Sequence, residues 1–153
     1  MIMLRMSPLR KVKTVKKDLI KLLEKGFASQ QQGDLEAAEK DYLKVLKHDK
    51  QNEFALNLLG VVCVRTERYQ EAVRYLSRAV RVNAKDPATH NNLGLADKGL
   101  TDFQKARKAF EQSLHLYARQ PVALIILGNT FAAVVDHEHA IPAFEAGLSH
   151  DPN

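Results

Sequence analysis

The chain has 153 residues, of which 45% are hydrophobic and 27% are charged. Its single cysteine, Cys63, rules out an internal disulfide and is typical of a reducing, cytoplasmic setting. The net charge of +5 is concentrated at the start of the chain, because residues 1–25 hold eight Lys or Arg and two acidic residues. The rest of the chain is nearly neutral and therefore offers no broad phosphate-binding face. No apolar run approaches the roughly 18 residues that a membrane-spanning helix needs.

Residues 1–18 form a basic N-terminal arm that leads into a helix. The first ten residues have no clean hydrophobic period and include Pro8, so we interpret them as a loose arm. They lack the apolar core of a secretory signal, and serine is too scarce for a typical organelle-targeting peptide. We favour a solvated helical extension, and contact with an anionic membrane or a nucleic acid through these basic residues is the alternative.

Helical spacing of apolar residues begins at Val12, and from residue 19 the chain divides into pairs of helices. The first pair covers residues 19–52, where Gly33-Asp34 predicts a helix end followed by a capping residue for the next helix. The second pair covers residues 53–86 and is predicted to turn at Thr66-Glu67-Arg68. Cys63 falls on its packed face, which predicts a buried structural thiol.

The third pair covers residues 87–120 and begins at Asp86-Pro87, a capping side chain followed by proline at the first helical position. Its internal turn, Thr101-Asp102-Phe103-Gln104, matches a capping box in which Gln104 reaches back to the cap. The fourth pair covers residues 121–153 and turns near Asp136. Pro142 lies inside its second helix, where it predicts a bend.

One repeat period, of about 34 residues, connects these helix pairs. Small residues stand on two ladders of this period, which are Gly26, Gly60, Gly94 and Gly128, and Ala38, Ala72, Ala106 and Ala140. A large residue follows each alanine by four positions, namely Tyr42, Leu76, Phe110 and Phe144. We expect the small residues to let two helices approach closely, with Phe110 filling the space beside Gly94. A fixed period in this range indicates a stacked helical array.

The dipeptides Leu59-Gly60, Leu93-Gly94 and Leu127-Gly128 resemble the tetratricopeptide repeat, and the likeness covers about residues 19–153. Lys25 in place of leucine and Asp97 in place of an aromatic residue depart from the family pattern. The resemblance implies an all-α fold, a right-handed superhelix (α-solenoid) of four helix-turn-helix repeats of about 34 residues each. The sequence around Asn91-Asn92-Leu93-Gly94 also resembles that of the repeat arrays that precede bacterial O-GlcNAc-transferase-like glycosyltransferase or sulfotransferase domains.

The resemblance further implies that the first helix of each pair lines a concave groove that binds a peptide. Its candidate residues here are Phe27, Phe54, Asn57, Leu58, Val61, Arg65, Asn91, Asn92, Leu95, Lys98, Val122, Ile125, Ile126 and Asn129. By helical period these positions lie opposite the Gly/Leu packing stripe. An apolar strip interspersed with amides suits an extended peptide or an amphipathic helix. The alternative is that superhelical curvature buries several of these residues between neighbouring helices.

Other classes of site find little support. Repeat arrays that bind chaperone tails resemble one another in a clamp of Lys, Asn and Arg, and of those positions only Asn92 fits here. His137 and His139 are two residues apart and cannot share a metal on one helix face, and no phosphate loop or nucleophile motif is present. We therefore predict neither an enzyme nor a cofactor or metal site.

The sequence thus favours a protein–protein interaction scaffold. The alternative is a substrate-recruiting module at the start of a larger enzyme, a glycosyltransferase or a sulfotransferase, whose catalytic domain follows Asn153. The stripe of Ala140, Phe144 and Leu148 on the last helix lacks a covering partner. We expect either more protein beyond it or self-association through it.

Overall fold

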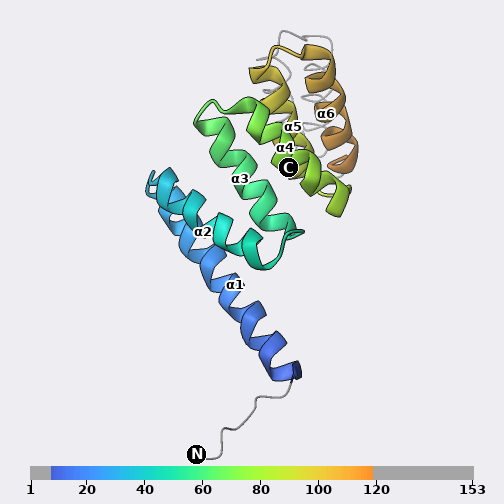
Figure 1. Ribbon diagram of the computed structural model, residues 1–153. Coiled ribbons are helices and arrows are strands. Elements are labelled where there is room, and N and C mark those ends of the chain that lie inside the picture. The colour runs from blue at the N-terminus through green and yellow to red at the C-terminus, as the bar shows by residue number, and fades with distance from the viewer. Residues whose placement is uncertain (1–7, 119–153) are drawn as a thin grey trace, which may run out of the picture.

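The computed structural model describes residues 8–118, with side chains from residue 14 onward, and forms six helices there (Figure 1). They are α1 (Pro8–Gln31), α2 (Leu35–His48), α3 (Glu53–Arg65), α4 (Tyr69–Val82), α5 (Pro87–Gly99) and α6 (Phe103–Leu116). Short turns join them into three helix pairs, and each pair packs on the one before it. The prediction of an all-α array of helix-turn-helix repeats is confirmed for these three pairs, and the fourth pair lies outside the described residues.

Helix α1 has 24 residues, against 14 in its partner α2, and its first turns extend past the end of α2 (Figure 1). The helix begins at Pro8, so the prediction that residues 8–10 belong to a loose arm was wrong. Proline has no backbone N–H to satisfy and its φ suits a helix, which makes the first helical position the place where it is tolerated best. The helix therefore takes in part of the basic segment.

The turns inside the three pairs share one unusual backbone conformation. Gly33, Glu67 and Thr101, which follow one another at the repeat period, have φ angles of 84°, 60° and 60°. The left-handed conformation of Thr101 removes it from the capping role, and Asp102 caps α6 instead, with its Oδ1 accepting a hydrogen bond of 3.2 Å from the Lys105 backbone N–H. The prediction of a capping box from Thr101 to Gln104 was therefore wrong. Asp34 and Asp86 cap α2 and α5 as expected.

The glycine ladder sets the distance between the two helices of each pair. A Cβ atom on Gly94 would lie 2.4 Å from the Phe110 ring. The matching contacts are 2.6 Å from Gly26 to Tyr42 and 2.4 Å from Gly60 to Leu76. Real Cβ atoms do not approach other atoms this closely, so only glycine fits beside these side chains. The predicted packing of small against large residues is confirmed in all three pairs.

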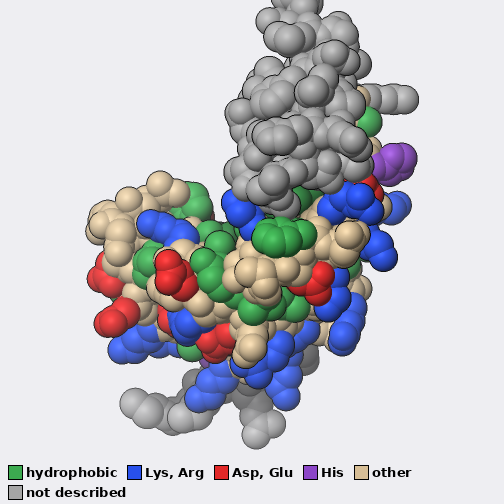
Figure 2. Space-filling model, turned by 90° about the horizontal axis from the view of Figure 1, so that it is seen from above, with side chains coloured by type: hydrophobic (Ala, Val, Ile, Leu, Met, Phe, Trp, Pro, Cys, Tyr) green, Lys and Arg blue, Asp and Glu red, His purple; other side chains and the backbone are tan. Residues whose placement is uncertain are grey.

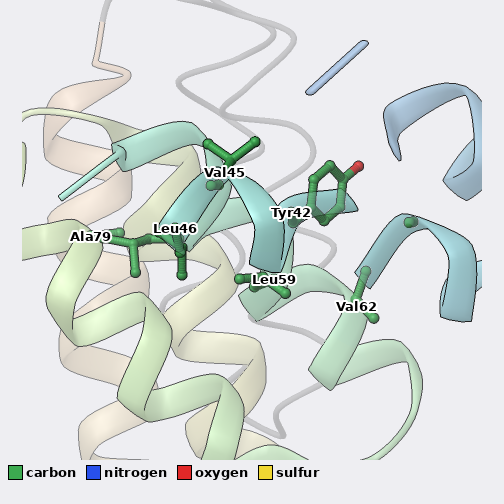
Figure 3. Close-up of a cluster of buried hydrophobic side chains, with 9 residues drawn as sticks. Tyr42, Val45, Leu46, Leu59, Val62 and Ala79 are labelled. Atoms are coloured by element: carbon green, nitrogen blue, oxygen red, sulfur yellow. The ribbon is translucent and has the colours of Figure 1, made fainter. Parts of the chain in front are cut away.

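Clusters of buried hydrophobic side chains lie between neighbouring helices of the array. Figure 3 shows one cluster, in which Tyr42, Val45 and Leu46 of α2 contact Leu59 and Val62 of α3 and Ala79 of α4. The Tyr42 hydroxyl donates a hydrogen bond of 2.8 Å to Gln30 Oε1, which satisfies both buried groups. Cys63 is fully buried, and this burial raises the pKa of its thiol to about 11. The prediction of a structural thiol is confirmed.

Within residues 8–118, no helix combines the length and the apolar character that crossing a membrane requires.

Candidate peptide-binding face

The first helices of the three pairs, α1, α3 and α5, follow one another along the array, and α3 contacts both of the others. They carry ten of the predicted groove residues, a set that we call the A face: Phe27, Phe54, Asn57, Leu58, Val61, Arg65, Asn91, Asn92, Leu95 and Lys98. Phe27, Phe54 and Arg65 are exposed and the other seven are half-buried. The alternative that neighbouring helices bury some of these residues thus holds in part, because none of the ten is fully buried but Leu58 packs against a core cluster. Val122, Ile125, Ile126 and Asn129 lie outside the described residues.

Apolar side chains of the A face form a row across the three helices. Phe27, Val61 and Leu95 follow one another at the repeat period and occupy the same position on α1, α3 and α5. Phe27 keeps 46% of its surface exposed, and Phe54, at the start of α3, keeps 63%. Leaving apolar surface of this size in water is unfavourable, at roughly 25 cal/mol per Å². A covering partner would recover this free energy.

The amide groups of the A face are arranged differently from the simple expectation of free peptide-binding groups. Asn92 Nδ2 donates a hydrogen bond of 2.8 Å to Asn57 Oδ1, and Asn57 Nδ2 donates one of 3.5 Å to Asp86 Oδ2. These bonds connect α3 to α5 and engage both polar ends of Asn57. Asn91 Oδ1 is buried without a donor among residues 14–118. Among these amides, the side-chain oxygen of Asn92 is thus the acceptor that a ligand could still use.

Charge is distributed unevenly along these helices. Arg65 lies in the last turn of α3 and Lys98 in the last turn of α5, whereas Glu53 and the capping Asp86 lie at the opposite ends. The Arg65 guanidinium donates a bond of 3.4 Å to the Gln30 carbonyl oxygen at the end of α1, which holds it across the repeat boundary. Cations at helix C-termini also complement the helix dipoles. Helices α3 and α5 therefore carry an acidic residue at or just before their N-terminal ends and a basic A-face residue at their C-terminal ends.

Sequence reasoning placed these residues on one face but missed the bonds that connect them. The pairing of Asn57 with Asn92 spans 35 positions, one more than the repeat period, and no local pattern signals it. Asp86 was expected only as a helix cap, and its second oxygen also accepts from Asn57. The bond could have been sought by aligning neighbouring repeats and looking for polar residues that are offset by one position.

Metal-binding groupings were the other kind of site to be considered on the described helices. In the part of the chain from residue 8 to residue 118, no three His, Cys, Asp or Glu side chains are placed to hold a metal ion. Figure 2 shows acidic and basic side chains on one view of the surface, with hydrophobic side chains between them. That surface presents a mixture of charges rather than the single-sign field that would attract a polyanion.

Three models of the tetratricopeptide repeat match the chain, over residues 22–52, 52–119 and 91–153. Together they cover residues 22–153, and their junction at residue 52 coincides with the turn between α2 and α3. The chain belongs to the tetratricopeptide-repeat family. The assignment accounts for the repeat period and for the glycine contacts with Tyr42, Leu76 and Phe110.

Curated tetratricopeptide-repeat proteins share a little under a third of their residues with this chain over the matched segments. A TPR repeat-containing protein of Pseudomonas aeruginosa is 30% identical over 113 residues, which is 73% of this chain and 19% of that protein. The Hsp70-Hsp90 organizing protein 2 of Arabidopsis thaliana is 28% identical over 96 residues, 58% of this chain and 16% of that protein. The chain thus spans about a fifth or less of the length of these curated relatives.

Solved tetratricopeptide-repeat structures have the same fold. MamA of Desulfovibrio magneticus RS-1 superimposes with a TM-score of 0.72 at 24% identity, over 92% of this chain and 80% of that one. The O-GlcNAc transferase of Thermobaculum terrenum, in a mutant form, gives a TM-score of 0.71 at 25% identity, over 76% of this chain and 22% of that one. The likeness to the transferase agrees with the resemblance seen around Asn91-Asn92-Leu93-Gly94.

Proposed function

We propose that this repeat array is a protein-interaction scaffold that binds a peptide or a helix across its A face. The observation that carries the proposal is the row of Phe27, Val61 and Leu95, in which apolar side chains at the same position on three successive helices are exposed (Phe27) or only half-buried (Val61 and Leu95). A side chain needed only for packing has no reason to be apolar and exposed at a repeated position. A peptide laid across the row would cover it.

The charges on the A face indicate what such a peptide carries. An acidic group at one end of the ligand would pair with Arg65 and Lys98, and its apolar side chains would lie over the row. Because Arg65 is held by the Gln30 carbonyl oxygen, it meets a carboxylate with less loss of side-chain freedom than an unrestrained arginine would. The expected ligand is therefore a short apolar segment flanked by an acidic residue.

Chaperone tails are not the ligand that this face favours, although the Arabidopsis Hsp70-Hsp90 organizing protein is among the relatives. Arrays that bind such tails resemble one another in a clamp with lysine at the position of Asn57. Here Asn57 is an uncharged amide whose oxygen and nitrogen are both engaged by protein groups. A single anchoring amide, Asn92, does not replace a cationic clamp, since binding two carboxylates requires positive charge.

Two aspartate variants of equal chemistry test the proposal. Phe27 on the A face and Leu43 on α2 are exposed to 46% and 42%, so replacing either by aspartate removes similar apolar surface without opening the core. A peptide selected from a displayed library on the wild-type protein serves as the ligand, measured by isothermal titration calorimetry. We expect Phe27→Asp to weaken binding by about tenfold or more and Leu43→Asp by less than about twofold.

The result that would reject the A face is equal binding by both variants, provided that circular dichroism shows both to be folded. A peptide displaced by Leu43→Asp alone would place the binding site on the second helices instead. Asn92→Ala is less suitable as the main variant, because it also leaves Asn57 Oδ1 without its donor. Its effect on binding could not be separated from an effect on packing between α3 and α5.

The likeness to the Thermobaculum O-GlcNAc transferase favours a second candidate, in which the same face recruits protein substrates to a catalytic domain of a larger protein. The groove chemistry is common to both candidates, and they differ only in what the array is attached to. The sequence of the full gene distinguishes them. A catalytic domain encoded in the same frame would support recruitment, and a gene that encodes repeats alone would reject it.

A further inference from the structure

A cavity of about 440 Å³ opens between α4, α5 and α6, on a side of α5 that the A face does not use. Its lining from α5 is His90, Leu93 and Asp97, whereas α5 contributes Asn91, Asn92, Leu95 and Lys98 to the A face. The two sets form separate stripes of the helix by its 3.6-residue period. The volume falls within the usual range of sites for small organic groups. We call it the α4–α6 pocket.

The repeat period explains why this pocket exists. Ala109 lines it from α6, and the residue one repeat earlier is Tyr75 on α4. Tyr75 packs against both hydrophobic clusters of the core, that of α2 and α3 and that around Cys63 and Leu76. The aromatic ring fills the space between α2 and α4, and at the next repeat a methyl group leaves the corresponding space open. The pocket thus lies where the preceding repeat has a tyrosine side chain.

One of the polar groups that line the pocket is the carboxylate of Asp97. Asp97 is only 5% exposed, and within residues 14–118 its side-chain oxygens accept no hydrogen bond. The nearby Lys105 ammonium lies 3.1 Å from Asp102 Oδ2, and His90 Nε2 lies 2.8 Å from the Ala84 carbonyl oxygen, so both are already engaged. The carboxylate is not fully buried, so an incoming donor would be able to reach it from the pocket.

The same register shows which donor fits. Cys63 occupies the position of Asp97 in the preceding repeat, and Tyr75 packs against the core cluster that contains Cys63. A ring placed in the α4–α6 pocket as Tyr75 is placed in its own groove would bring its hydroxyl toward Asp97. A cationic donor is disfavoured, because Lys105 and Lys108 also line the pocket. The chemistry therefore favours a neutral phenol.

We propose that the α4–α6 pocket is a second binding site, which receives a tyrosine side chain of a partner protein and bonds its hydroxyl to Asp97. The apolar walls, among them Val73, Val80 and Leu93, contact the ring. The site is independent of the A face and allows one array to hold two segments at once. Two contacts on separate faces raise the overall affinity through effective concentration.

N-acetyltyrosine amide and N-acetylphenylalanine amide, added at millimolar concentration to the isotope-labelled wild-type chain, test this site by NMR. We expect the tyrosine probe to shift backbone amide signals of α4, α5 and α6 and to bind about fivefold more tightly than the phenylalanine probe, the ratio that one net hydrogen bond gives. Ala109→Tyr, which places a ring where Tyr75 has one, should abolish binding of both probes. Asp97→Leu should remove the preference for tyrosine.

Tyr75→Ala is the matched control, because it opens the equivalent space with Cys63 in place of the carboxylate. It should admit both probes without preference, and if this variant does not fold, Asp97→Leu still decides the role of the carboxylate. Equal binding of the two probes to the wild type would overturn the proposal, as would tyrosine binding that persists in a folded Ala109→Tyr variant. Binding of free p-cresol without binding of N-acetyltyrosine amide would overturn the assignment to a protein side chain.

Discussion

Replacing Gly94 by alanine tests the contact on which the repeat architecture depends. The new methyl group would lie 2.4, 2.6 and 2.8 Å from three atoms of the Phe110 ring, which is fully buried and cannot move toward solvent. Overpacking of a core costs about 1–3 kcal/mol, whereas alanine gains about 1 kcal/mol over glycine inside a helix. Because the contact is so close, the cost of overpacking should exceed the gain in helix propensity. We therefore expect a net loss of about 1–2 kcal/mol in the free energy of unfolding.

Urea denaturation followed by circular dichroism measures this loss, with an unchanged slope as the sign that only stability has changed. The Phe110→Ala background provides the decisive comparison, because there the methyl group meets no ring. In that background Gly94→Ala should stabilise by about 0.5–1 kcal/mol, so the sign of its effect reverses. An equal loss in both backgrounds would refute the reasoning, since the cost would then not come from the Phe110 ring.

Three further predictions concern backbone strain in the turns, the buried Asp97 carboxyl and the buried Cys63 thiol. Thr101→Gly should raise the free energy of unfolding by about 1 kcal/mol, because a β-branched residue at a φ of 60° is strained. Gly33→Ala should lower the free energy of unfolding, because it places a side chain at a φ of 84°. Equal melting temperatures for Thr101→Gly and the wild type would contradict the first prediction. Burial, with Asp102 nearby, raises the pKa of Asp97 above its ordinary value of 3.8, so the ionised carboxyl costs stability at neutral pH. Asp97→Asn should therefore stabilise the protein at pH 7, by an amount that shrinks as the pH falls toward 3.8. A gain in stability that urea titrations show to be the same at every pH would count against a raised pKa of Asp97. Cys63, with its thiol pKa raised to about 11 by burial, should react with a thiol reagent at pH 8 far more slowly in the native protein than in urea, and equal rates would show that it is not buried.

The fold could be predicted from the sequence because its determinants recur at a fixed distance along the chain. Gly60 with Leu76 and Gly94 with Phe110 are separated by the same interval, so one helix-turn-helix geometry explains them together. Helix ends were less predictable. The capping box expected from Thr101 failed because the backbone there turns left-handed, and the arm before Val12 proved helical from Pro8. Both errors concern local choices that the repeat period does not constrain.

The candidate site also has features that the repeat period predicts and features that depend on helix packing. That Phe27, Val61 and Leu95 share a face follows from the period alone, whereas their degree of exposure depends on how closely α1, α3 and α5 pack. No local pattern signals the bond from Asn92 to Asn57, since it joins side chains of different repeats whose distance is set by the stacking of helices.

The sequence by itself determined the unit, a pair of helices with glycine against a large side chain, because these choices depend on local spacing and on volume. Only the tertiary structure decided what lies between units. Whether Ala109 is covered by a neighbour or leaves a pocket, and whether Asp97 finds a donor, depends on side chains from three helices meeting in space. No single helix carries that information, because burial and hydrogen bonding across repeats are properties of the packed array.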